Sequence, residues 1–304
     1  MEPTGSRPVP RQGVRVDVRA RGIADSAFVE LTRQAVAAVV SANANAAGPV
    51  RLRVTAGRCA SGPVLVQVNL LVRGEPARVQ IAARTPQAAA GAALDRLERQ
   101  IRRLALNLDL SAWPLPWRRT LAASGEGAVA RLKAVRLHTA AFADAAMRLT
   151  AMDYDAHLFT DADTGLEAVV YRTGTEQLRL ARQQPGNPSM RGCSVQVDAR
   201  PALVLDPAHA ARRLEATAAP FVFYTDRDTG RGNLLYRRYD GELGLISPLA
   251  AEPWPSVDRA PAEAGESGGG AGQSGSQPRE EVGVLLEIEN SRTASARSST
   301  AAAV

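Results

Sequence analysis

The sequence predicts an α+β protein: an N-terminal β-α-β-β-β-α domain, then two small related α+β modules that form a pseudo-dimer. Two observations predict this fold class. Apolar residues follow strand and helix spacing over about the first 110 residues. A segment also occurs twice, because Asp161 to Arg172 reads DADTGLEAVVYR and Asp226 to Arg237, 65 positions later, reads DRDTGRGNLLYR. A repeated segment indicates either two related small domains or one domain that contains both halves of a pseudo-symmetric pair, and two copies are too few for a solenoid.

The N-terminal elements follow from periodicity. Apolar and polar residues alternate from Val14 to Val18, which predicts a strand. Asp25 or Ser26 can cap a helix with an apolar stripe at Phe28, Leu31, Ala35 and Val39. Strand-like runs follow at 50–55, 64–72 and 77–82, and a second helix at about 86–107 carries Leu94, Leu97, Ile101 and Leu104 on its core face. We expect a four-stranded sheet with two helices on one face.

Each repeat predicts a helix followed by two strands around the Asp-Thr-Gly turn. The helices are expected at about 140–152 and 207–216, and a further strand at 243–246. Trp113-Pro114-Leu115-Pro116-Trp117 predicts a stiff connector. The expected divisions are a disordered start (1–12), the first domain (13–110), a Pro/Trp linker (111–128), two modules (129–182 and 192–250) and a disordered acidic Gly/Ser tail (251–304), in which Val282 to Ile288 is strand-like.

Composition limits the class of protein. The chain has 45% apolar residues and a mean hydropathy of −0.16, with no apolar run long enough for a membrane span and no secretory signal at its start. Two cysteines, Cys59 and Cys193, fit a reducing compartment, so we expect a cytoplasmic protein. Residues 1–110 hold 16 arginines against 8 acidic residues, whereas residues 251–304 have a net charge of −4. A basic domain of this kind favours a polyanionic partner, most often nucleic acid.

The arginines of the first domain form two sets. One set occupies the polar alternate of the predicted strands and so projects from the face opposite the helices, and the other lies on one side of the second helix, away from its core stripe and toward solvent. A solvated charged face is the alternative interpretation, but few carboxylates are interleaved with the arginines. Few aromatic residues accompany them, which favours structured RNA over stacked single strands. The candidate RNA-binding residues are Arg15, Arg19, Arg51, Arg53, Arg78, Arg96, Arg99, Arg102 and Arg103.

No pattern indicates catalysis, a metal or a cofactor, so we expect none and do not expect an enzyme. The Asp161/Asp163 and Asp226/Asp228 pairs resemble the start of a calcium loop, but they lack the later ligands. We therefore expect hairpin turns in which Gly165 and Gly230 adopt positive φ. The three histidines have no ligand spacing around them, and His157 lies in a strand pattern typical of a packing residue.

Three segments resemble long-form ribosome hibernation promoting factors. VNLLVRGEPARVQIAARTPQAAAGAALDRLERQIRR from Val68 is similar to the family's ribosome-binding domain. PFVFYTDRDTGRGNLLYRRYDGELGLISP from Pro220 and MDYDAHLFTDADTGLEAVVYR from Met152 each resemble its C-terminal module. Two such modules resemble the hypoxia- and dormancy-induced variant of high-GC actinobacteria. The resemblance implies a stress factor that binds rRNA of the small ribosomal subunit in the mRNA and tRNA path, with Arg96, Arg99 and Arg103 at the family's basic positions, and that excludes tRNA.

In that family the C-terminal module forms a homodimer through its sheet, which joins two ribosomes. We expect the two copies to pair within one chain, because covalent linkage gives a high effective concentration. The protein would be a monomer that holds single ribosomes. The first copy ends in YRTGTEQLRL and lacks the YRRxDGxxGLI strand of the second. The alternative is a protein-interaction scaffold in which the repeated module is the active part. The candidate pairing residues are Phe159, Val170, Tyr171, Phe221, Phe223, Leu235, Tyr236, Tyr239 and Leu245.

Overall fold

A computed structural model describes residues 14–22, 24–43, 45–57, 62–106, 129–173, 177–184, 196–217 and 219–249. The Trp113 to Trp117 connector, both cysteines and the tail with its Val282 to Ile288 patch lie outside the described residues. Their structures therefore stay predictions. None of the helices in the described part of the chain is both long and apolar enough to cross a membrane.

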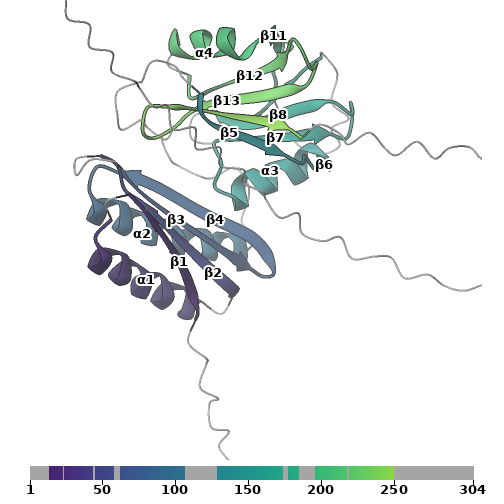
Figure 1. The fold of residues 1–304 in the computed structure, drawn as a ribbon. Helices are drawn as coiled ribbons and strands as arrows, with labels where there is room; N and C mark the ends of the chain where they lie inside the picture. The colour runs from purple at the N-terminus through teal and green to yellow at the C-terminus, as the bar shows by residue number, and fades with distance from the viewer. Residues whose placement is uncertain are drawn as a thin grey trace, which may run out of the picture.

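The N-terminal domain has the predicted order of elements. These are β1 (Val16–Arg21), α1 (Ser26–Ser41), β2 (Ala46–Thr55), β3 (Val64–Val72), β4 (Glu75–Ala83) and α2 (Pro86–Ala105). The strands form one sheet in the order β1-β2-β3-β4, parallel between β1 and β2 and antiparallel elsewhere. Both helices cover the same face of this sheet (Figure 1). The predicted fold class is confirmed.

Both helices begin where the sequence indicated, each with a side chain that caps its first turn. The carboxylate of Asp25 accepts the Ala27 N–H at 3.0 Å, and the Thr85 hydroxyl accepts the Ala88 N–H at 3.2 Å. On α1 the predicted stripe was only partly right: Phe28 and Val39 pack against the core, but Leu31 is 65% exposed, and Val36 and Val40 are the buried valines. Thr32 is buried on that face because its hydroxyl donates to the Phe28 carbonyl at 2.8 Å. The apolar pattern therefore came close to the true core face but missed Thr32.

The remaining elements form the two modules. The first segment holds β5 (Val129–Val135), β6 (Thr139–Ala140), α3 (Phe142–Ala151), β7 (Ala156–Asp161), β8 (Glu167–Thr173) and β9 (Gln177–Arg182). The second holds β10 (Gln196–Val197), β11 (Leu203–Leu205), α4 (Pro207–Glu215), β12 (Phe221–Asp226), β13 (Gly232–Arg237) and β14 (Leu243–Pro248). The expectation that the first copy lacks its last strand was wrong. β9 pairs with β8 as β14 pairs with β13, because Leu178 and Leu180 alternate toward the core although the motif is absent.

The two modules exchange their first strands. The sheets run β10-β9-β8-β7-β6 and β11-β12-β13-β14-β5. Thus β5, which precedes the first module, lies parallel to β14 of the second, and β10, which precedes the second module, lies parallel to β9 of the first. The repeat spacing makes β5 and β10 equivalent elements. Each sheet is therefore completed by a strand from the other copy, so the pair is interlocked within one chain.

The inner faces of the two sheets pack against each other, with α3 and α4 on opposite outer sides (Figure 1). Leu158 and Val169 of the first module meet Leu234 of the second, and aromatic side chains surround these three. Polar groups close the rim. Glu167 accepts hydrogen bonds from Arg231 Nε at 2.6 Å and from the Gly232 N–H at 3.1 Å, while Gln183 Nε2 donates to the Gly230 carbonyl at 3.0 Å. This module pair forms one packed body.

Gly232→Ala is expected to lower the free energy of unfolding by about 1–3 kcal/mol, as overpacking of a filled interior does. A Cβ at Gly232 would lie 2.5 Å from the Cβ of Glu167 across the module interface. Gly91→Ala is the control, because that helical position has open space and should gain up to about 1 kcal/mol. Urea unfolding measures both, and equal stability of Gly232→Ala and wild type would contradict the packing described here.

The stability of the first module is expected to fall in acid through His157. Its ring stacks between Tyr154 at 5.8 Å and Phe159 at 6.2 Å, as expected of a packing residue. Burial, followed by the charges of Arg148 and His138, lowers the pKa of His157 from 6.5 to about 4. The unfolded chain therefore binds the extra proton first, and stability present above pH 6.5 is lost as the pH falls toward 4. We expect a loss of about 1–3 kcal/mol, which His157→Phe should reduce in urea titrations at pH 7 and pH 5; an unchanged pH dependence would contradict this.

Candidate nucleic-acid interface

Exposed arginines lie on the outer face of the N-terminal sheet, opposite its helices. The side chain of Arg15 is 90% exposed and contacts Asp17 at 3.2 Å, and Arg19 and Arg51 are exposed as well. The register places Arg19 directly opposite Arg53 on the neighbouring strand. This placement concentrates positive charge on one part of the face, and guanidinium groups bind phosphate oxygens. This part of the face is therefore suited to a phosphate backbone.

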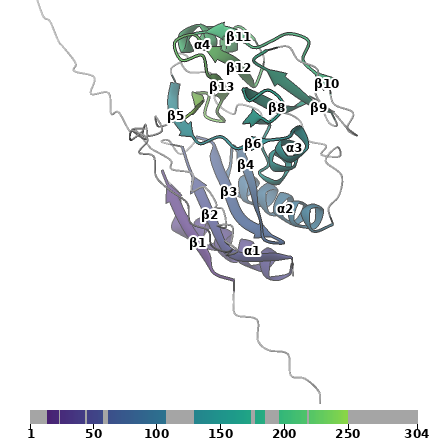
Figure 2. The same cartoon turned by 90° about the vertical axis from the view of Figure 1, so that its right-hand side faces the viewer.

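The arginines of α2 do not form one stripe. Arg99 and Arg102 are exposed, and the ion pair of Arg102 with Glu98 at 2.8 Å is solvated and contributes little stability. Arg96 and Arg103 are only 6% exposed. The expectation that the α2 arginines share one solvent-facing side is corrected for these two. Their face of α2 also carries the buried Gln100, and it is turned toward the first module, where α3 lies beside α2 (Figure 2).

The turn after α3 docks on this face of α2 and on the edge strand β4. Asp153 is buried, with a φ of +51°. One carboxylate oxygen accepts hydrogen bonds from Arg96 Nε at 3.0 Å and from Arg96 Nη2, and the other accepts the Gln80 N–H at 3.1 Å. Gln100 Nε2 donates to the carbonyls of Thr150 at 2.7 Å and Ala151 at 3.0 Å. Side chains of the first domain thus cap the carboxyl end of α3.

Arg78 belongs to the same contact. Its Nε donates to the Met152 carbonyl at 2.8 Å, and its guanidinium lies 4.4 Å from the centre of the Tyr154 ring. On the module side, Arg172 donates to the Thr150 hydroxyl at 2.7 Å. Burial, followed by the charges of Arg103 and Arg96, lowers the pKa of Arg172 to about 10, and Asp153 and Asp155 oppose this shift. Like charges are therefore crowded at this contact.

The structure thus divides the predicted RNA-binding residues by accessibility. Five remain exposed, namely Arg15, Arg19, Arg51, Arg99 and Arg102. Arg53 is half-buried on the outer sheet face, close enough to Tyr239 of the second module to affect the pKa of that phenol. The remaining three candidates lie in the contact with the first module: Arg78, Arg96 and Arg103. Sequence patterns did not indicate Asp153 and Gln100, and an acidic residue directly after a helix was the one available signal for the former.

The Asp-Thr-Gly segments are hairpin turns, as predicted. They join β7 to β8 and β12 to β13, with φ of +69° at Gly165 and +67° at Gly230. The carboxylates serve the turns, because Asp161 accepts the Asp163 N–H at 3.0 Å and Asp226 accepts the Thr229 N–H at 3.0 Å. Within the described ranges, no three His, Cys, Asp or Glu side chains gather in a way that could hold a metal ion.

Three of the candidate pairing residues lie between the modules: Tyr171, Phe221 and Phe223. Four others are corrected, because they face inward to a module's own helix: Phe159 and Val170 toward α3, and Leu235 and Leu245 toward α4. Tyr236 packs over Gly244, and Tyr239 lies beside Arg238. The contacts that the sequence missed are Leu158, Val169, Leu234, Ile246, Glu167 and Gln183. Successive residues of a strand point to opposite faces of the sheet. Both sets of alternate residues in these strands are apolar, so the sequence did not show which set faces the other module.

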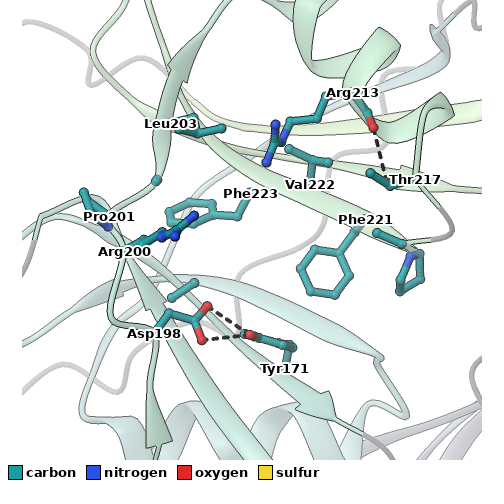
Figure 3. Close-up of a pocket in the computed structure, with 14 residues that line it drawn as sticks. Tyr171, Asp198, Arg200, Pro201, Leu203, Arg213, Thr217, Phe221, Val222 and Phe223 are labelled. Carbon is teal, nitrogen blue, oxygen red and sulfur yellow. Dashed lines mark hydrogen bonds between the residues drawn. The ribbon is translucent and has the colours of Figure 1, made fainter.

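A groove of about 440 Å³ marks the edge of the module pair. Phe221 and Phe223 line it from the second module, and Tyr171 lines it from the first (Figure 3). The Tyr171 hydroxyl donates to Asp198 at 2.9 Å, and burial followed by this carboxylate raises the pKa of the phenol to about 12. The groove is therefore part of the packing between the modules.

Comparisons with known proteins agree with this architecture. The family model described as "Sigma 54 modulation/S30EA ribosomal protein C terminus" matches twice, at residues 125–180 and 195–245. The "Dormancy associated translation inhibitor" of Mycobacterium tuberculosis, strains CDC 1551 and H37Rv, is 43% identical over 261 residues, which cover 81% of this chain and 92% of that protein.

Solved structures give shorter matches. The Protein Y N-terminal domain of Thermus thermophilus has a TM-score of 0.25 and 18% identity over 31% of this chain and 99% of that one. A ribosomal subunit interface protein of Coxiella burnetii has a TM-score of 0.24 and 12% identity over 30% of this chain and 97% of that one. The matched family is one of ribosome-associated factors and not of enzymes. With an identity of 43% across most of both chains, this protein belongs to the long-form ribosome hibernation promoting factor family, in a variant with two C-terminal modules in tandem.

Proposed function

We propose that this protein is a cytoplasmic hibernation factor that binds rRNA of the small ribosomal subunit in the mRNA and tRNA path. It would exclude tRNA, stop translation and preserve idle ribosomes under stress. Its relative in Mycobacterium tuberculosis is named as a translation inhibitor associated with dormancy, which supports inhibition on the ribosome. The exposed Arg15, Arg19 and Arg51 on an open sheet face support contact with phosphates.

The reciprocal strand exchange is the observation that carries the preference for single ribosomes. Both copies of the module are used within one chain, since β5 completes the second sheet and β10 completes the first. The apolar faces that could bind a second molecule are already packed against each other through Val169 and Leu234. An intramolecular partner has the advantage of a high effective concentration. We infer that the protein is a monomer that does not join two ribosomes.

Neutralising exposed arginines should weaken binding to purified small subunits and reduce its salt dependence. For Arg19→Gln with Arg51→Gln we expect the slope of log K against log salt to fall by about 2, since each lost phosphate contact removes about one. The matched control is Arg212→Gln with Arg213→Gln, which removes the same charge from exposed positions of α4. Equal slopes for the two double variants would contradict the proposed surface and favour the scaffold alternative.

Sucrose gradients of ribosomes with the full-length protein should contain inactive single ribosomes. Light scattering of the free protein should give a mass near the 32.1 kDa of one chain. A free protein of twice that mass, together with a peak of paired ribosomes, would overturn the single-ribosome proposal while leaving ribosome binding intact.

A further inference from the structure

Oxygen atoms at the end of α3 and in the turn after it accept hydrogen bonds from donors of the first domain. Asp153 supplies both carboxylate oxygens, to Arg96 and to the edge of β4. The carbonyls of Thr150, Ala151 and Met152 accept hydrogen bonds from Gln100 and Arg78. A phosphate group offers the same kind of acceptor to a guanidinium fork. The turn is therefore positioned as a substitute for a polyanion on this face.

The charge at this contact favours exchange with a stronger anion. Arg78, Arg96 and Arg103 approach from the first domain, and Arg172 approaches from the module. The acidic groups at the turn are Asp153 and Asp155. Burial and the two neighbouring guanidiniums lower the pKa of Arg172 to about 10. Removing arginines from water is costly, and an RNA backbone brings a row of several phosphate charges where the turn supplies two carboxylates.

We propose that the first module is a built-in competitor of RNA: the turn at Asp153 holds the protein in a closed state that covers Arg78, Arg96 and Arg103, and structured RNA binds these residues only after the turn has left. This inference rests on the proposed binding of rRNA. The exposed arginines make the first contact, and the module pair then swings away as one body. Only the open fraction of the protein can bind RNA at these residues, so the apparent Kd equals the intrinsic Kd divided by that fraction.

The test measures binding of the full-length protein to purified small subunits at one fixed salt concentration. Asp153→Asn removes the charge but keeps a residue type that tolerates a φ of +51°. We expect the apparent Kd to fall about tenfold, because the binding-competent fraction rises. Small-angle scattering of the free variant should show a larger radius of gyration than that of wild type.

Two further variants separate opening of the closed state from a change in net charge. Asp144→Asn changes the charge by the same amount at the exposed first turn of α3, and its Kd should stay within about twofold of wild type, as for a surface substitution away from the contact. Gln100→Leu removes the two hydrogen bonds to α3 carbonyls without a change of charge. It should act in the same direction as Asp153→Asn, and circular dichroism checks that both variants stay folded.

The outcomes are distinct. Tighter binding by Asp153→Asn and Gln100→Leu, but not by Asp144→Asn, supports the closed state. Wild-type affinity for both interface variants overturns it while leaving the proposed function intact. An equal gain for Asp144→Asn and Asp153→Asn also overturns it, because net charge alone then explains the effect. If no form of the protein binds small subunits, the proposed function fails, and the inference fails with it.

Discussion

Each copy of the repeat contributes one edge strand to the sheet of the other, and the two inner faces then close on an apolar layer. β5 and β10 are equivalent in the repeat, so the arrangement has the symmetry of a dimer within one chain. The exchange covers a sheet edge in each module, and the face around Leu158, Val169 and Leu234 is withdrawn from solvent. The end of α3 and the turn after it contact α2 and β4 of the N-terminal domain.

The carboxyl end of α3 has hydrogen-bond partners in the N-terminal domain in addition to those in its own module. Gln100 donates to two of its last carbonyls, and Arg96 places a positive charge at the negative end of the helix dipole. Asp153 in turn neutralises Arg96 in a buried site, where loss of either partner is costly. The contact between domain and module is thus polar, directional and specific, unlike the apolar layer between the modules. Polar contacts of this kind can compete with solvent and with phosphate.

Much of the fold was accessible from the sequence, because strand alternation, caps and the repeated turn are local properties. Asp25, Thr85 and the glycines of the two turns lie where local chemistry requires them. The candidate site was less accessible. Phe159 and Leu158 are both apolar neighbours on one strand, and only the packing of the second sheet decides which of them faces it. Likewise, the burial of Arg96 depends on Asp153, 57 positions away, which no periodicity connects.

Tandem duplication permits a division of labour that a homodimer cannot have. The repeat spacing of 65 residues aligns Asp153 of the first copy with Ala218 of the second. Alanine has no carboxylate, so the second copy cannot offer Arg96 the same ion pair. In a symmetric dimer both subunits would carry the same residue, and either module could cover a basic domain. In one chain a single module holds the docking acid, so the basic domain is covered once, by its immediate neighbour in sequence.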